Sequence, residues 1–65
     1  MKNILSMRQL ASLKSFALGN SQVQISEKNN IALSTVKQAL FVATKKLNAQ
    51  SVTHAVYLAA KANII

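Results

Sequence analysis

The sequence predicts an all-α fold of four helices, in a single domain that spans residues 1–65. Helix-breaking residues are scarce, because proline is absent and glycine occurs once, at Gly19. Apolar residues recur at intervals of three and four along most of the chain, which is the spacing of one face of a helix. Serines stand where a helix start needs a cap, at Ser6, Ser21 and Ser51. These signals agree with one another, and no strand is expected.

The first two helices are each expected to begin at a capping box. Residues 6–9 and residues 21–24 both have the form S-x-x-Q, in which serine and glutamine each bond the other's backbone N–H. The first box predicts a helix at about 7–18, which ends at Gly19 because glycine is a natural C-cap. The second box predicts a shorter helix at about 22–28.

A third helix is expected at about 33–47, after a tight turn over residues 29–31 whose asparagines tolerate left-handed backbone. At 100° per residue, the two sides of this helix differ in character. The apolar side consists of Val36, Leu40, Ala43 and Leu47, with Ala39 at its flank. The opposite side consists of Lys37, Gln38, Phe41 and Lys45.

A fourth helix is expected at about 52–62, with Ser51 as its cap. Its apolar stripe consists of Val52, Ala55, Val56, Ala59 and Ala62. The four helices should share one core, formed by Leu10, Leu13, Ile25, Val36, Leu47 and Val56.

The charge of the chain narrows its possible functions. The chain has eight lysines and arginines but only one acidic residue, Glu27, so its net charge is +7. The expected partner is therefore a polyanion. Paired-carboxylate catalysis needs two acids, and the single histidine, His54, has no evident acidic partner for a triad. We therefore expect no enzyme and no catalytic residue. Because cysteine is absent and no second ligand accompanies the histidine, no metal or cofactor is expected.

Membrane association is also not expected. No apolar run approaches the ~18 residues of a membrane span, and Arg8 and Lys14 interrupt what would be a signal peptide. The sequence thus favours a cytoplasmic protein, associated with the nucleoid if it binds DNA. Met1 directly before the fold favours a complete chain.

A short helix, a short turn and a longer basic helix make a helix-turn-helix. Several short motifs then match the pattern of one family. In the first half of the chain, residues 5–8 match its L-T-x-R; Leu13, Ala17 and Gly19 match its L, A and G; residues 19–21 match its G-x-S; and Ile25 matches the isoleucine of its K-E-I-A. In the second half, residues 35–37 match its T-V-K, residues 46–47 match its K-L, residues 55–56 match its A-V, and residues 64–65 match its closing apolar pair. On these residues the chain resembles the LuxR-type (GerE-like) DNA-binding domain over nearly its whole length.

The chain departs from this family's pattern mainly in its acids and in its turn. The family usually has glutamate at the positions of Gln9, Ala11 and Gln24, so their loss raises the positive charge. Three further positions differ: Asn29 replaces a leucine, Ala32 a capping serine or asparagine, and Ala39 a common histidine.

The resemblance implies a sequence-specific, DNA-binding regulator of transcription whose third helix enters the major groove. Its base-reading candidates are Lys37, Gln38 and Phe41. Lysine can contact a guanine edge or a phosphate, and glutamine can pair with adenine. Phe41 lies where the family often has a basic or polar residue; its ring could touch a thymine methyl, enter a protein interface or fold inward. Phosphate contacts are expected from Ser21, Ser34, Thr35, Lys45 and Lys46.

The resemblance also implies a two-fold dimer through the fourth helix. Its interface candidates are Val52, Ala55, Val56 and Ala59. The expected partners are therefore double-stranded DNA and a second copy of the chain, together with a larger regulator or RNA polymerase.

Two other classes of function remain open from the sequence. In the first, Phe41, Val42 and the fourth helix form a protein–protein interaction module that binds a larger regulator, and DNA binding is weak or lost. In the second, the chain is a cationic membrane-active peptide, but such peptides have one wide apolar face on a single helix rather than four capped segments. Salt-dependent binding to duplex DNA distinguishes the regulator from both alternatives.

Overall fold

The computed structural model describes residues 4–65, and this part of the chain forms four helices without a strand. The helices are α1 (Met7–Ala17), α2 (Gln22–Asn29), α3 (Leu33–Lys46) and α4 (Val52–Lys61). The predicted all-α class is confirmed, and each helix begins and ends within one residue of its predicted bounds.

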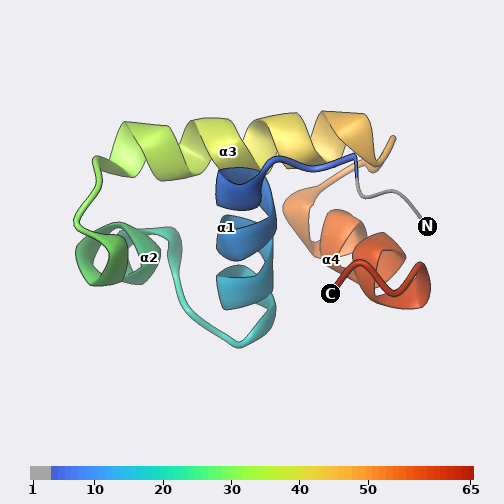
Figure 1. Ribbon diagram of the computed structural model, residues 1–65, viewed down its shortest axis with the longest axis horizontal. Coiled ribbons are helices and arrows are strands. Elements are labelled where there is room, and N and C mark those ends of the chain that lie inside the picture. The colour runs from blue at the N-terminus through green and yellow to red at the C-terminus, as the bar shows by residue number, and fades with distance from the viewer. Residues whose placement is uncertain (1–3) are drawn as a thin grey trace.

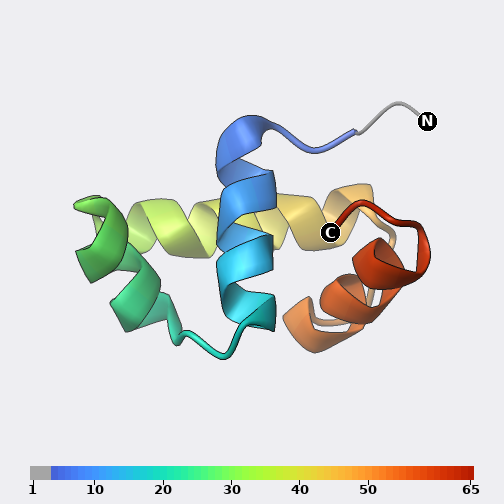
Figure 2. The same ribbon diagram turned by 60° about the horizontal axis from the view of Figure 1, so that its bottom comes forward.

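The longest helix, α3, extends over the other three. In Figure 1, α1 lies across the middle of α3, α2 lies below its N-terminal end and α4 lies near its C-terminal end. Figure 2 shows the same arrangement from below, with α2 and α4 on opposite sides of α1. Both α1 and α3 contact all three other helices, whereas α2 and α4 do not contact each other. One side of α3 is therefore covered along its length, and the other side is left open.

The helix starts follow from short-range capping, as the sequence predicts. At the start of α1, the Ser6 hydroxyl oxygen accepts the Gln9 N–H at 3.2 Å, and the Gln9 side-chain oxygen accepts the Ser6 N–H at 3.0 Å. Residues 21–24 form the same capping box at the start of α2. Ser51 caps α4 by accepting the His54 N–H at 3.1 Å.

All four helices end in one backbone motif. The residue that leaves each helix has a left-handed conformation, with φ of 99° at Gly19, 55° at Asn30, 57° at Asn48 and 60° at Asn63. In each case its N–H bonds the carbonyl three residues earlier, and the next N–H bonds the carbonyl five residues earlier than itself, which is the Schellman pattern. Asparagine replaces glycine at three of these positions because its short polar side chain tolerates this conformation.

Two of the departures from the family pattern flank the turn between α2 and α3: Asn29 is the last residue of α2, and Ala32 directly precedes α3. Asn29 is exposed, and its side-chain amide donates to the Ile25 carbonyl at 2.8 Å, so the position needs no apolar residue. Ala32 has the extended backbone of an N-cap, with φ −67° and ψ 146°, but it makes no side-chain cap bond. Helix α3 is thus the one helix of the described chain that starts without a serine cap.

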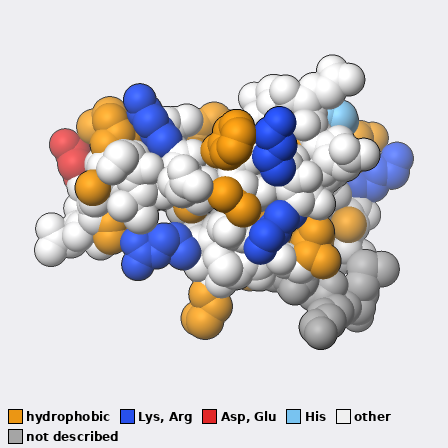
Figure 3. Space-filling view, turned by 90° about the horizontal axis from the view of Figure 1, so that it is seen from above, with side chains coloured by type: hydrophobic (Ala, Val, Ile, Leu, Met, Phe, Trp, Pro, Cys, Tyr) orange, Lys and Arg blue, Asp and Glu red, His pale blue; other side chains and the backbone are white. Residues whose placement is uncertain are grey.

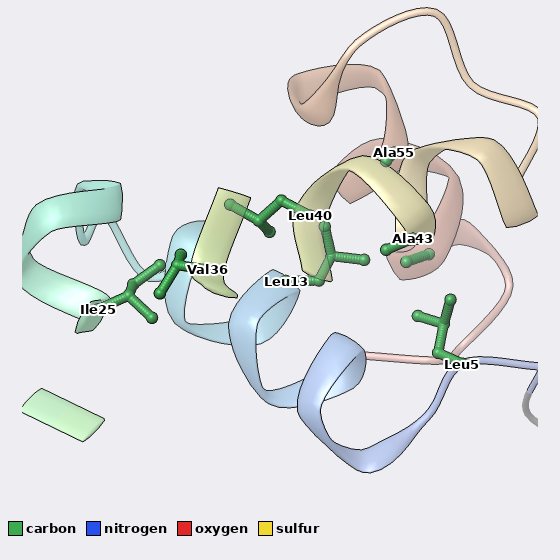
Figure 4. Close-up of a cluster of buried hydrophobic side chains, with 8 residues drawn as sticks. Leu5, Leu13, Ile25, Val36, Leu40, Ala43 and Ala55 are labelled. Carbon is green, nitrogen blue, oxygen red and sulfur yellow. The ribbon is translucent and has the colours of Figure 1, made fainter. Parts of the chain in front are cut away.

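The core lies between α3 and the other helices, as Figure 4 shows. Its largest fully buried side chains are Leu13, Ile25, Val36 and Leu40. Of the six predicted core residues, Leu13, Ile25 and Val36 are fully buried, and the other three pack partly buried against the cluster: Leu10, Leu47 and Val56. The cluster also includes Leu5, Ala43, Ala55 and Ala59. Leu5 precedes α1, so helical periodicity could not identify it.

We expect Ala32→Ser to raise the free energy of unfolding by about 1 kcal/mol, because a serine at this backbone geometry can accept an unpaired N–H of the first turn of α3. Urea denaturation measures the effect. Ala60→Ser is the matched control, since Ala60 is exposed inside α4 and the new hydroxyl has no cap to make. Equal or lower stability of Ala32→Ser would show that the start of α3 needs no cap.

Candidate nucleic-acid interface

The outer face of α3, formed by Lys37, Gln38, Phe41 and Lys45, is the surface where the three predicted base-reading residues meet one predicted phosphate contact. It exists because the opposite side of the helix is buried, at Val36, Ala39, Leu40 and Ala43. All four residues of the outer face are exposed, as the helical wheel predicts. Phe41 keeps 58% of its surface accessible. This excludes the third option for Phe41, in which the ring folds inward.

The outer face combines positive charge with one aromatic ring. Lys37, Phe41 and Lys45 follow one another at intervals of four residues, so they form a row along α3. The ammonium nitrogen of Lys45 lies 5.3 Å from the centre of the Phe41 ring, in cation–π geometry. Figure 3 looks onto this side of the molecule, where Lys and Arg side chains lie around hydrophobic ones and acid appears at the edge. Because α3 contains no acid, nothing on the helix itself neutralises this charge.

An open groove of about 380 Å³ runs beside the outer face. Besides residues of α3, it is lined by Gln22 from the first turn of α2 and by the segment 49–52 that leads into α4. The sequence did not identify Gln22 or Gln50 as site residues, since a periodicity within one helix cannot show what the fold brings beside it. A ligand on the outer face would therefore also meet the start of α2.

The predicted phosphate-binding hydroxyls all lie at helix starts. Ser21 caps α2, and its oxygen accepts the Gln24 N–H at 3.1 Å, which still lets the hydroxyl donate to another group. Ser34 is exposed and Thr35 is half-buried in the first turn of α3. Helix N-termini favour anions through their N–H groups and their dipole. The positions of these three hydroxyls are thus compatible with phosphate contacts.

Lys46 differs from its neighbour Lys45. Its ammonium group donates to the Ile4 carbonyl at 3.1 Å and to the Gln9 side-chain oxygen at 2.9 Å. These bonds connect the last turn of α3 to α1 and to the segment before it. Lys46 is therefore a weaker phosphate candidate than Lys45, whose ammonium group lies over the outer face.

The prediction of a dimer interface at Ala55 and Ala59 is wrong for these two residues. Both are completely buried within the chain, because their small side chains allow α4 to pack closely on its neighbours. Val52 and Val56 are also half-buried against the core. The exposed side of α4 carries Tyr57 instead, with 57% of its surface accessible. Periodicity had found the apolar stripe correctly but could not show that the chain itself covers it.

Other parts of the described chain offer fewer functional groups. A second open groove, of about 460 Å³, lies between α1 and the end of α2 and is lined by Met7, Arg8, Ala11, Ser12, Asn29 and Ile31. Residues 4–65 contain no group of three or more His, Cys, Asp or Glu side chains placed to hold a metal ion. None of the helices described is both long and apolar enough to cross a membrane.

Comparison with known families gives one match. The sequence model of the family described as "Bacterial regulatory proteins, luxR family" (GerE) matches residues 3–59. This range includes α1, α2, α3 and most of α4, so it contains the whole outer face and all the helix starts. Comparisons with curated proteins and with solved structures gave no match.

Proposed function

Because the chain belongs to the luxR family of bacterial regulatory proteins, which are DNA-binding regulators, we propose that it binds specific DNA sequences by inserting α3 into the major groove. The observation that carries this proposal is the outer face of α3, which exposes two lysines, a glutamine and a phenylalanine while its opposite side is buried. A helix of this length is about 21 Å long and fits within a major groove.

The positive charge supplies affinity that is independent of sequence. Seven net charges on a 65-residue chain attract the phosphate backbone, and each phosphate contact releases bound counterions. Lys45 lies near the C-terminal end of α3, where the backbone is nearer than the base edges, so its role is phosphate contact. Ser21, Ser34 and Thr35 add hydroxyls at helix starts.

Sequence preference comes from the N-terminal and middle parts of α3, since the N-terminal part of this helix points at base edges in helix-turn-helix docking. Gln38 has the amide that pairs with the adenine edge, and Lys37 can donate to guanine. Both side chains are exposed, and within residues 4–65 neither makes a hydrogen bond that would hold it away from a ligand.

We also propose that two copies bind side by side through the exposed side of α4. The support is an aromatic pair, in which the rings of His54 and Tyr57 lie 6.5 Å apart and nearly parallel, at 20°. Tyrosine is enriched in protein interfaces. Such a dimer uses Tyr57 in place of Ala55 and Ala59, which are buried within each copy.

The second candidate is a protein-interaction module that contacts a larger regulator or RNA polymerase. The observation in its favour is the exposed ring of Phe41. It differs from the DNA-binding proposal in one measurable respect, because a module of this kind need not bind duplex DNA.

Selection of bound sequences from a random duplex pool tests the proposed function. The expected result is an enriched site with two symmetric half-sites about 10 base pairs apart, as a two-fold dimer requires. A single enriched half-site would contradict the proposed dimer but would still support sequence-specific DNA binding. No binding to any duplex at low salt would contradict the proposed function and favour the interaction module.

We expect Lys45→Ala to weaken binding to the selected duplex and to a scrambled duplex equally, and to lower the salt slope by about one unit per protomer. Lys46→Ala is the matched control: it removes the same charge from a side chain that bonds Ile4 and Gln9. We expect it to lower thermal stability and to change the salt slope less. If Lys46→Ala lowers the slope as much as Lys45→Ala, then the contact is not specific to the outer face.

Gln38→Ala should cost about 1–3 kcal/mol of binding free energy on the selected duplex and relax the preference at one base pair per half-site. Its effect on the scrambled duplex should be small, because Gln38 carries no charge. Titrations of both duplexes with both proteins measure this difference. Equal losses on the two duplexes would mean that Gln38 does not read a base.

A further inference from the structure

We propose that Phe41 reads thymine, through contact between its ring and the C5 methyl group in the major groove. This inference rests on the proposed function and specifies the base chemistry that the outer face of α3 recognises. It predicts that each preferred half-site contains a thymine that faces this ring.

Phe41 has a position that no other exposed apolar side chain of the described residues shares. Exposure alone does not identify a site, because other large apolar or aromatic residues are also exposed: Ile4, Met7, Leu18, Val23 and Tyr57. Phe41, however, lies in the middle of α3, flanked by lysines one turn before it and one turn after it. Its ring lies outside the core with 58% of its surface accessible, so most of its apolar surface is open to a molecule from outside the chain.

The charge around the ring favours DNA as that molecule. Lys37 and Lys45 lie one turn before and one turn after Phe41, about 12 Å apart along the helix axis. The positive charge beside the ring, with the Lys45 ammonium group 5.3 Å from its centre, suits the negative potential of DNA, whose phosphates border the major groove. A protein surface over Phe41 would need acids on both sides of an apolar spot to neutralise the same pair.

The chemistry of the base edges then selects thymine. A phenyl ring has no hydrogen-bond donor or acceptor, so it cannot distinguish the polar groups that guanine, cytosine and adenine present. Among the four bases, thymine alone adds an apolar group, its C5 methyl, to the major-groove edge. Covering that methyl with the exposed ring removes apolar surface from water on both partners.

The spacing along α3 gives the place of this thymine. Phe41 lies three residues beyond Gln38, a rise of about 4.5 Å along the helix. Successive base pairs are about 3.4 Å apart. The thymine should therefore be one or two base pairs from the pair that Gln38 contacts.

Deoxyuridine substitution tests the inference, because uracil pairs as thymine does but lacks the methyl group. Each thymine of the selected duplex is replaced in turn, and Kd is measured for the wild type, Phe41→Ala, Phe41→Leu and Leu18→Ala. At one position per half-site, we expect the wild type to bind about fourfold more weakly, the equivalent of one buried methyl group. Phe41→Ala should not discriminate thymine from uracil there, and Phe41→Leu should do so partially.

Leu18→Ala is the control, since it shortens another exposed apolar residue and should keep the full thymine preference. Circular dichroism checks folding, and Phe41→Leu provides a second test if Phe41→Ala is unstable. Equal uracil effects in the wild type and the Phe41 variants, or no sensitive thymine at all, would overturn the inference while DNA binding stands. Failure of the wild type to bind any duplex would overturn both the inference and the proposed function.

Discussion

The burial of one side of α3 determines the rest of this domain. Val36, Ala39, Leu40 and Ala43 of that helix turn inward, and α1, α2 and α4 all pack there. A chain of 65 residues without cysteine has little other apolar surface with which to stabilise a fold. Rotating α3 about its axis would expose these residues and replace them with lysine and glutamine. The outer face therefore cannot change its orientation without the loss of the core.

Features that depend on one segment could be predicted from the sequence, whereas features that depend on packing between segments could not. The capping boxes at Ser6 and Ser21 and the outer face of α3 need only local bonds and the 100° turn per residue, and the structure has them as expected. The burial of Ala55 and the groove contribution of Gln22 depend on where α4 and α2 lie. An apolar stripe looks the same in sequence whether its own chain or a second copy covers it.

Glutamines at two positions where the family usually has glutamate affect both the stability of the fold and its net charge. Gln9 stands where the family usually has glutamate, and its side-chain oxygen accepts bonds from both the Ser6 N–H and the Lys46 ammonium group. An amide thus keeps the geometry of the capping box and of the bond between Gln9 and Lys46, and it does so without neutralising a lysine. Gln24 keeps the second capping box in the same way. Both capping boxes use an uncharged amide in place of a carboxylate, so they do not offset the positive charge that attracts a polyanion.

The claim that the outer face of α3 is the DNA-binding surface is tested most directly by mapping where the duplex binds. Backbone amide chemical shifts, followed by NMR while the selected duplex is added, report this residue by residue. The account predicts that the changes concentrate on α3 from Ser34 to Lys45 and on the first turn of α2 around Gln22. Unchanged shifts on α3, with changes confined to the groove between α1 and the end of α2, would contradict it.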